Sequence, residues 1–110
     1  MAKFKSAFYQ DLEKNLKNPE FAAAYYREGL RTKMIDDLIN QLDDARAMEG
    51  TSKTELALAL QQEPANVRRF FTSKRRNPTI SSLIDISLAL GYRIKLEPLT
   101  KAEKKQLQAS

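Results

Sequence analysis

The sequence predicts an all-α protein that ends in one short β-strand, and three observations lead to this fold class. Apolar residues recur at intervals of three and four along most of the 110 residues, as in helices with one buried face. Serine, threonine, asparagine, proline and glycine stand where such helices would begin and end. Only one stretch, after residue 91, alternates in polarity as a strand does. The length fits one domain with a small core, which dimerisation would help to stabilise.

The N-terminal part is expected to contain two helices. Residues 3–16 carry one apolar stripe at four-residue intervals, which we interpret as a packing surface. Its members are Phe4, Phe8, Leu12 and Leu16. Asn18 and Pro19 suit the N-cap and the first residue of a second helix. Gly29 is expected to weaken or end that helix, because glycine is a poor helix former.

A third helix is predicted over residues 32–48, and Gly50 is expected to end it. Its expected buried face consists of Ile35, Leu38, Leu42 and Ala45, with Ile39 at the margin. Four carboxylates are expected to face solvent, namely Asp36, Asp37, Asp43 and Asp44. Such pairs can also serve metal binding or acid–base chemistry, but no histidine or other ligand type stands beside them, so we favour a plain helix surface.

Two short helices separated by a tight turn are predicted next. Ser52 and Glu55 match a capping box at the start of the first helix. That helix is expected to bury Leu56, Ala57 and Leu60. Pro64 suits the first residue of the second helix, which is expected to bury Val67 and Phe70, with Phe71 as a further candidate. A turn of three or four residues between short helices is typical of a helix-turn-helix.

A last long helix is predicted after a polar, basic loop over residues 72–77. Thr79 is expected to cap this helix, and Gly91 is expected to end it. The residues expected on its buried face are Ile80, Leu83, Ile86, Ala89 and Leu90.

Residues 92–97, from Tyr92 to Glu97, alternate apolar and polar side chains and predict a strand that Pro98 stops. The chain contains no second strand to pair with it, and an unpaired strand leaves its backbone groups open. Two interpretations follow: the strand pairs with another chain, either a second copy or a different protein, or the segment is a short extended tail on the body of the protein. Residues 99–110 are polar and are expected to fray.

The composition excludes several kinds of site. The chain has no cysteine and no histidine, which removes disulfides, thiolate metal sites and histidine-based nucleophilic catalysis. None of its three glycines is spaced to cradle a phosphate, so we expect no cofactor, no metal and no enzymatic activity. The longest apolar run, residues 56–60, is too short to cross a membrane, and the charged first residues lack a signal-peptide core. A soluble cytoplasmic protein is therefore expected.

The charge is unevenly distributed along the chain, whose net charge is +5. Residues 64–84 contain five basic side chains and no acidic one, whereas residues 34–63 contain two basic and seven acidic side chains. Such clustering is typical of a surface that binds a polyanion. The alternative is a solvated charged face, but such faces usually mix their signs.

The second helix of the predicted helix-turn-helix contains the candidate DNA-reading residues, because such a helix meets base edges with its N-terminal part. Arginine can bond guanine O6 and N7 with both arms, asparagine can pair likewise with adenine, and an apolar side chain can touch a thymine methyl. The candidate base readers are Asn66, Arg68, Arg69, Pro64 and Ala65. The candidate phosphate contacts are Lys53, Lys74, Arg75 and Arg76.

The chain resembles the XRE (Cro/C1-type) helix-turn-helix family over roughly residues 34–91. The matching positions are Gly50-Thr51-Ser52-Lys53-Thr54-Glu55-Leu56-Ala57, Val67, Arg69, Lys74 through Asn77-Pro78-Thr79, Leu83, Ile86 and Ala89-Leu90-Gly91. The resemblance implies a lambda-repressor-like five-helix DNA-binding domain at residues 32–91, preceded by a helical extension at 1–31 and followed by a strand and polar tail at 92–110.

The flanks narrow the resemblance to HigA-type antitoxins and related addiction-module antidote proteins. They contain the stretches Asn18-Pro19-Glu20-Phe21-Ala22-Ala23 and Gly91-Tyr92-Arg93-Ile94-Lys95-Leu96-Glu97-Pro98. The resemblance implies a homodimer on a palindromic operator, repression of its own operon, and neutralisation of a co-encoded ribonuclease toxin. Two alternatives remain open: a stand-alone or phage-type regulator without a toxin, and a protein-interaction module that does not bind DNA.

The chain departs from the family pattern at four positions. Gln61 stands in the turn where the family usually has glycine, Lys53 where it usually has glutamine, and Pro64 and Ala65 where it usually has polar residues. Glutamine in that turn must take a backbone shape that glycine takes more readily. The family's base contacts do not carry over unchanged, so Asn66, Arg68 and Arg69 are expected to be the main readers.

Overall fold

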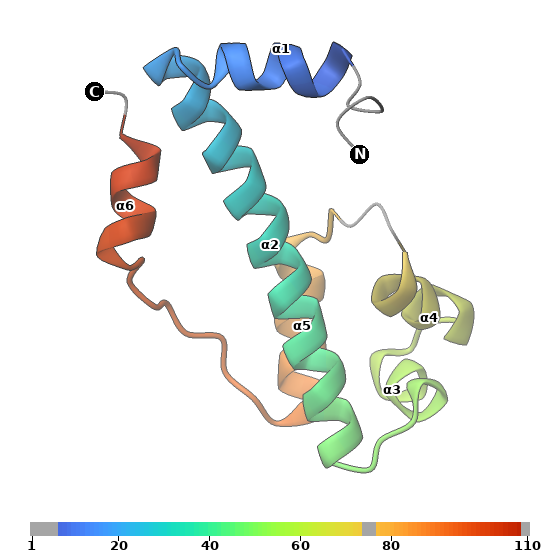
Figure 1. Cartoon of the computed structure of the whole chain (residues 1–110). Helices are drawn as coiled ribbons and strands as arrows, with labels where there is room; N and C mark the ends of the chain where they lie inside the picture. The colour runs from blue at the N-terminus through green and yellow to red at the C-terminus, as the bar shows by residue number, and fades with distance from the viewer. Residues whose placement is uncertain (1–6, 74–76, 109–110) are drawn as a thin grey trace. The chain divides into compact units, whose positions relative to one another are not determined.

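The computed structural model describes residues 7–73 and 77–108 of the chain. Within these ranges it contains α-helices and no β-strand, which confirms the predicted all-α class (Figure 1). The helices are α1 (Ala7–Asn15), α2 (Pro19–Met48), α3 (Lys53–Leu60), α4 (Pro64–Thr72), α5 (Ile80–Leu90) and α6 (Lys101–Leu107). The chain divides into two compact units: Lys33–Leu96, and the segments before and after that range.

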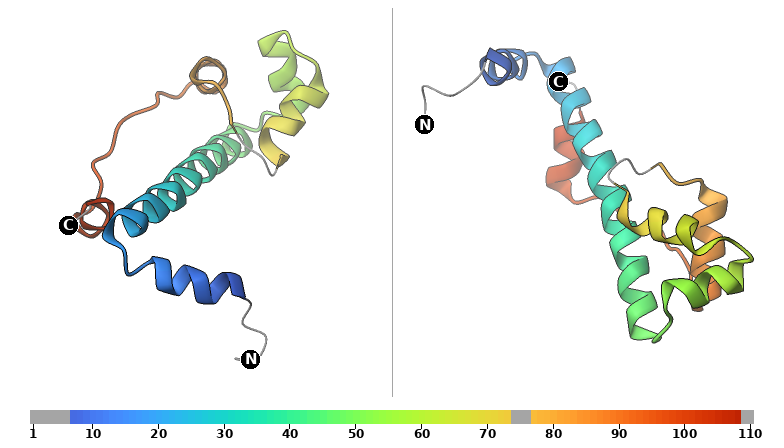
Figure 2. Two further views of the ribbon diagram at one scale, coloured as in Figure 1. Left: turned by 90° about the horizontal axis from the view of Figure 1, so that it is seen from above. Right: turned by 90° about the vertical axis from the view of Figure 1, so that its right-hand side faces the viewer.

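The two helices expected on either side of Gly29 form one continuous helix, α2 (Figure 2). An isolated glycine costs a helix about 1 kcal/mol relative to alanine, which is too little to end it. Residues 30–48 contain no proline that would break the helix by removing a hydrogen bond. The predicted N-cap is present, since Asn18 Oδ1 accepts a hydrogen bond from the Glu20 backbone amide at 3.0 Å.

The Lys33–Leu96 unit has a buried core to which α2, α3, α4 and α5 all contribute. Its members are Ile39, Leu42, Ala45, Leu56, Ala57, Val67, Phe71, Ile86 and Leu90. The expectation for α2 was wrong in one respect: Ile39 is only 1% exposed, whereas Ile35 and Leu38 are half-buried. Apolar residues occur at helical spacing on both candidate faces of α2, so the periodicity alone did not distinguish them.

α5 contains more apolar residues than one face of a helix can bury. Ile86 and Leu90 are buried and Leu83 is half-buried, as expected, but Ile80 is 74% exposed and Ala89 is also exposed. α4 also differs from the expectation. Phe70 was expected to be buried and Phe71 was only a further candidate, whereas Phe71 is buried and Phe70 is half-buried. Where a helix has more apolar residues than one face can bury, the neighbouring helices determine which of them are buried.

Three helices end in a residue with left-handed backbone conformation, as the sequence suggested for each of them. These residues are Gly50, Gln61 and Gly91, with φ values of 68°, 55° and 84°. After each of them, the next backbone amide donates to the carbonyl five residues earlier at 2.8–3.0 Å, which is the Schellman arrangement. Gln61 therefore adopts a conformation that glycine takes more readily.

The segment after α5 differs from the prediction in two ways. Residues 92–100 have an irregular backbone, so the strand expected from Tyr92 to Glu97 does not form within the described chain (Figure 2). A strand requires a hydrogen-bonded neighbour, and residues 7–73 and 77–108 contain no other strand. The tail expected to fray contains α6, which begins with a capping box. Thr100 Oγ1 accepts from the Glu103 amide at 3.1 Å, and the Glu103 carboxylate accepts from the Thr100 amide at 2.9 Å.

Candidate nucleic-acid interface

The helices α3 and α4, with residues 61–63 between them, form the candidate site. The predicted capping box begins α3: Ser52 Oγ accepts from the Glu55 amide at 3.0 Å, and the Glu55 carboxylate accepts from the Ser52 amide at 3.1 Å. Pro64 is the first residue of α4, where its missing amide hydrogen removes no helical hydrogen bond. The two short helices and their tight turn therefore lie where the sequence predicted them.

One aliphatic and one aromatic side chain, both buried, fix the orientation of α4 on the core. Val67 and Phe71, one helical turn apart, are 2% and 5% exposed and belong to the core. Phe70 lies edge-on against Phe71, with ring centroids 5.1 Å apart. At 100° per residue, the face opposite this anchor has Arg69 near its centre. The exposed residues of α4 on and beside that face are Ala65, Asn66, Arg68, Arg69 and Thr72.

The predicted base readers all lie in α4, and two of them contact each other. Asn66, Arg68, Arg69 and Ala65 are exposed, whereas Pro64 is half-buried. Arg69 Nη2 donates a hydrogen bond to Asn66 Oδ1. Sequence reasoning treated these two residues as independent readers. Their spacing of three residues, which brings side chains together on a helix surface, was the available signal.

Of the predicted phosphate-contacting residues, the structure describes one. Lys53 is the first residue of α3 and is half-buried. Its Nζ lies 5.9 Å from the centroid of the Phe71 ring, within the range of a cation–π attraction. The Lys53 ammonium is thus held where α3 meets α4. Lys74, Arg75 and Arg76 lie outside the described residues.

Thr72 belongs to the exposed face of α4 and was missed by the sequence analysis, which assigned it to the following loop. The structure includes Thr72 in α4, and its Oγ1 donates to the Arg68 carbonyl at 2.8 Å. Thr72 follows Arg68 by four residues and Arg69 by three. Extending the helical period by one more turn would have placed it beside both arginines.

The arginines of α4 have no carboxylate partner at ion-pair distance in the described part of the chain, although Asp85 lines the same cavity as Arg69. α4 itself contains no aspartate or glutamate. No carboxylate among residues 7–73 and 77–108 forms an ion pair with Arg68 or Arg69, whereas Arg31 and Arg46 pair with Glu28 and Asp43 at 3.3 and 2.9 Å. The two guanidinium charges on α4 are therefore available to a negatively charged partner.

A cavity of about 290 Å³ borders α4 on the side of Asn66 and Arg69. Its apolar lining consists of Ile39, Leu60, Val67, Phe70, Pro78 and Ile86. Its polar lining consists of Gln62, Asn66, Arg69, Ser73, Asn77, Ser82 and Asp85. The Asn66–Arg69 pair therefore lies between solvent and this cavity.

Arg46 forms hydrogen bonds that stabilise the turn between α2 and α3. Its Nε donates to Asp43 Oδ1 at 2.9 Å, and its Nη1 donates to the Thr51 carbonyl, also at 2.9 Å. Asp43 was expected to face solvent, and its side chain is 39% exposed while it pairs with Arg46. The pair fixes the end of α2 relative to the start of α3.

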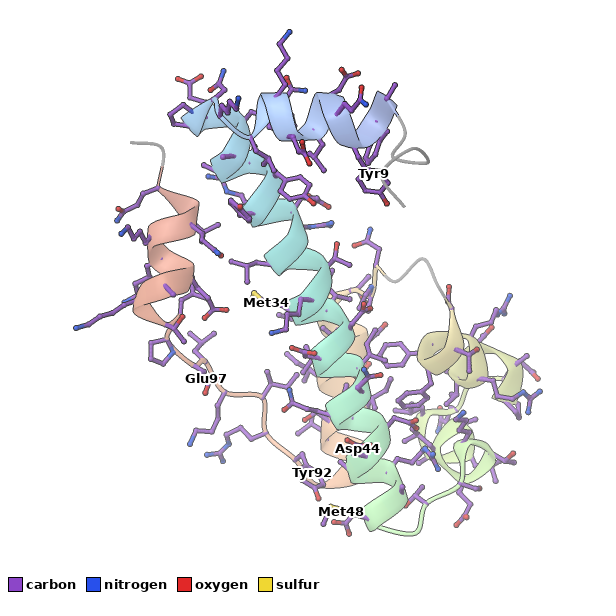
Figure 3. The ribbon with its side chains drawn as sticks, in the orientation of Figure 1. Tyr9, Met34, Asp44, Met48, Tyr92 and Glu97 are labelled. Carbon is purple, nitrogen blue, oxygen red and sulfur yellow. The ribbon has the colours of Figure 1, made fainter. Side chains whose placement is uncertain are left out.

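Tyr92 connects the end of α5 to the end of α2. Its hydroxyl donates to Glu49 Oε1 at 3.1 Å, and its carbonyl accepts from Ser87 Oγ at 2.6 Å. The hydrogen bond to the Glu49 carboxylate, with smaller contributions from desolvation and charge, raises the pKa of Tyr92 above its ordinary value. Figure 3 shows Tyr92 near Met48, and both line a groove of about 260 Å³.

In the part of the chain that the structure describes, no helix is long and apolar enough to cross a membrane. The same residues contain no cluster of three or more potential metal ligands among aspartate, glutamate, histidine and cysteine. No family model, curated protein or solved structure matches the chain. The resemblance to the XRE family therefore rests on the sequence motifs alone.

Proposed function

We propose that this protein is a transcriptional regulator that binds double-stranded DNA sequence-specifically, with α4 in the major groove. One observation carries the proposal: Val67 and Phe71 anchor α4 on the core so that Arg68 and Arg69 lie on exposed surface without a carboxylate partner. In a helix-turn-helix, the second helix contacts base edges from this position. The lambda-repressor-like fold implied by the sequence resemblance is part of the proposal.

The proposed contacts divide into two kinds. Arg68 and Arg69 read base edges, because a guanidinium can donate two hydrogen bonds to one guanine. The Ala65 methyl can touch a thymine methyl, and Pro64 lies at the same end of the helix. Lys53 and the basic residues Lys74, Arg75 and Arg76 contact phosphates, which positions the protein but carries no sequence information.

We further propose a homodimer on a palindromic operator. Ile94 and Leu96 are 39% and 101% exposed in the irregular segment after α5, and antiparallel pairing of two copies of residues 92–97 would complete the strand that one chain cannot form. α5 adds an exposed apolar stripe of Ile80, Ile84 and Leu88, and exposed apolar patches typically mark interaction sites. Sedimentation at high micromolar concentration should give a dimer; a monomer would contradict this part of the proposal.

A protein partner is the next part of the proposal. The N-terminal helices expose several large aromatic side chains, namely Phe8, Tyr9, Phe21, Tyr25 and Tyr26. Aromatic residues are enriched at protein interfaces. Together with the sequence resemblance, this favours an antitoxin that represses its own operon and neutralises a co-encoded ribonuclease toxin. A stand-alone regulator is the alternative if no toxin gene adjoins this one.

The same aromatic surface favours a second candidate function, a protein-interaction module without DNA affinity. The two functions differ in a titration of the pure protein onto its own upstream DNA and onto a scrambled duplex, at two salt concentrations. Tight binding to the upstream DNA alone, weakened by salt, supports the regulator, because phosphate contacts release counterions. Equal and weak binding to both duplexes favours the interaction module, and the partner should then be sought with the N-terminal helices as bait.

The substitution Arg69→Ala tests the base-reading role of α4. It should reduce discrimination between operator and scrambled DNA by about 1–3 kcal/mol, the typical contribution of one bidentate base contact. Arg31→Ala is the matched control, because Arg31 is an exposed arginine in α2 outside the candidate site. Equal losses on both duplexes for Arg69→Ala would assign this arginine to phosphate rather than to a base.

A further inference from the structure

We propose that Asn66 does not read adenine but is a positioning residue, which holds the Arg69 guanidinium so that the pair reads guanine. This inference rests on the proposed DNA-binding function. The observation behind it is the hydrogen bond that Arg69 Nη2 donates to Asn66 Oδ1. Both residues are exposed, and α4 is fixed beneath them by Val67 and Phe71.

The hydrogen bond changes what Asn66 can offer to a base. Reading adenine requires the amide to accept from the adenine N6 amino group and to donate to N7 at the same time. Asn66 Oδ1 already accepts from Arg69, which occupies one of its two lone pairs and directs this oxygen toward the arginine, while Nδ2 keeps both of its donors. The guanidinium has five N–H donors and no acceptor, and only one of those donors is used by Asn66. The pair therefore presents mainly donors, and the second lone pair of Asn66 Oδ1 is its remaining acceptor.

A surface that consists mainly of donors matches one purine better than the other. Guanine presents two acceptors in the major groove, O6 and N7, whereas adenine presents one acceptor and one donor. The adenine amino group would face another donor, which leaves both unpaired. A phosphate also consists of acceptors, but a contact with phosphate would show no preference for any base. A measured base preference therefore distinguishes a contact with guanine from a contact with phosphate.

Asn66 also restricts the conformations of the arginine. An exposed arginine side chain has many rotamers, and the ordering of such a side chain opposes binding. With Arg69 already bonded to Asn66, less ordering remains for the moment of contact. Loss of Asn66 should therefore weaken the guanine preference at the position that Arg69 reads. It should not change the base preference at any other position.

The test is selection of binding sites from a pool of random duplexes by the full-length protein and its variants. The unsubstituted protein should select sites with guanine at a defined position. Arg69→Ala should lose that preference by about tenfold or more. Asn66→Ala should lose part of the preference at the same position, by several-fold, and the double variant should lose no more than Arg69→Ala alone.

Two further variants separate positioning from a general loss of binding. Asn66→Asp keeps an acceptor for Arg69 and should retain the guanine preference, even though its negative charge weakens binding to all DNA. Asn40→Ala removes an exposed amide from α2, outside the candidate site, and should change no base preference. Thermal melting of each variant confirms that its fold is retained.

The other possible outcomes would contradict either the positioning role of Asn66 or the proposed DNA-binding function. Loss of an adenine preference at a second position in Asn66→Ala would show that Asn66 reads its own base, and would overturn the inference alone. An unchanged guanine preference in Asn66→Ala would overturn it as well. Selected sites without a base preference at the Arg69 position would assign the pair to phosphate. No selected sequence at all would overturn the proposed function, and the inference with it.

Discussion

The two units of the chain use their apolar side chains in opposite ways. In Lys33–Leu96 they form a buried core from parts of four helices. Among the described residues of the other unit, Ala23 is the one buried side chain, and α1 and α6 bury none. Short helices are marginal in water without tertiary packing. Non-local packing therefore stabilises the core unit, whereas the flanking helices depend mainly on local interactions.

The largest expected effect comes from the core of Lys33–Leu96. Leu56→Ala should lower the free energy of unfolding by about 2–5 kcal/mol, because the side chain is 1% exposed and its removal leaves a cavity. Leu58→Ala is the control in the same helix. Leu58 is 73% exposed, so the change should stay within about 0.5 kcal/mol. Urea unfolding followed by circular dichroism measures both, and similar losses would contradict the burial described for α3.

The two capping boxes provide a direct comparison between the units. Ser52→Ala should lower the free energy of the main unfolding transition by about 1 kcal/mol, because α3 is part of the core. Thr100→Ala removes an equivalent cap from α6, which buries no residue, and should change that transition by less than about 0.5 kcal/mol. Amide hydrogen exchange should show faster opening of α6 alone. A loss as large as that in Ser52→Ala would mean that the two units unfold together.

Helix ends were predictable because their chemistry is local. The caps at Asn18, Ser52 and Thr79 and the left-handed ends at Gly50 and Gly91 depend on residues within a few positions of each other. The same rule would have predicted α6, since Thr100 and Glu103 repeat the spacing of Ser52 and Glu55. That signal was present and was outweighed by the polar composition of the tail.

Burial and continuity were less predictable because they depend on distant parts of the chain. α5 has apolar residues on several of its faces, so the sequence pattern did not show that Ile80 is exposed and Ile86 is buried. The continuity of α2 through Gly29 depends on the stability of the whole helix, which one residue does not decide. The strand expected at residues 92–97 required a neighbouring strand, which the described part of the chain does not contain.

The candidate site shows the same division. The positions of α3, α4 and their turn followed from caps and spacing, and so did the exposure of Arg68 and Arg69. The hydrogen bond between Arg69 and Asn66 and the position of Lys53 over Phe71 depend on side-chain conformations, which residue types alone do not specify. Sequence thus predicted which residues gather on the face, but not how they pair.

The smallest expected effect concerns the turn between α3 and α4. Gln61 has φ of 55°, a left-handed conformation that costs a residue other than glycine about 1–2 kcal/mol. Gln61→Gly removes this strain, but it also gives the unfolded chain more freedom, which offsets about 0.4–1 kcal/mol. The net result should be a gain in stability of up to about 1 kcal/mol, measured by urea unfolding.

Gln62→Gly is the matched control for that gain. Gln62 does not have a positive φ, so glycine there relieves no strain and should destabilise the protein through the unfolded state alone. Opposite signs for the two neighbouring substitutions would locate the strain at one residue of the turn. They would also show that the main transition reports on a single turn of the core unit. Destabilisation by both would mean that Gln61 makes a contribution in the turn that outweighs its backbone strain.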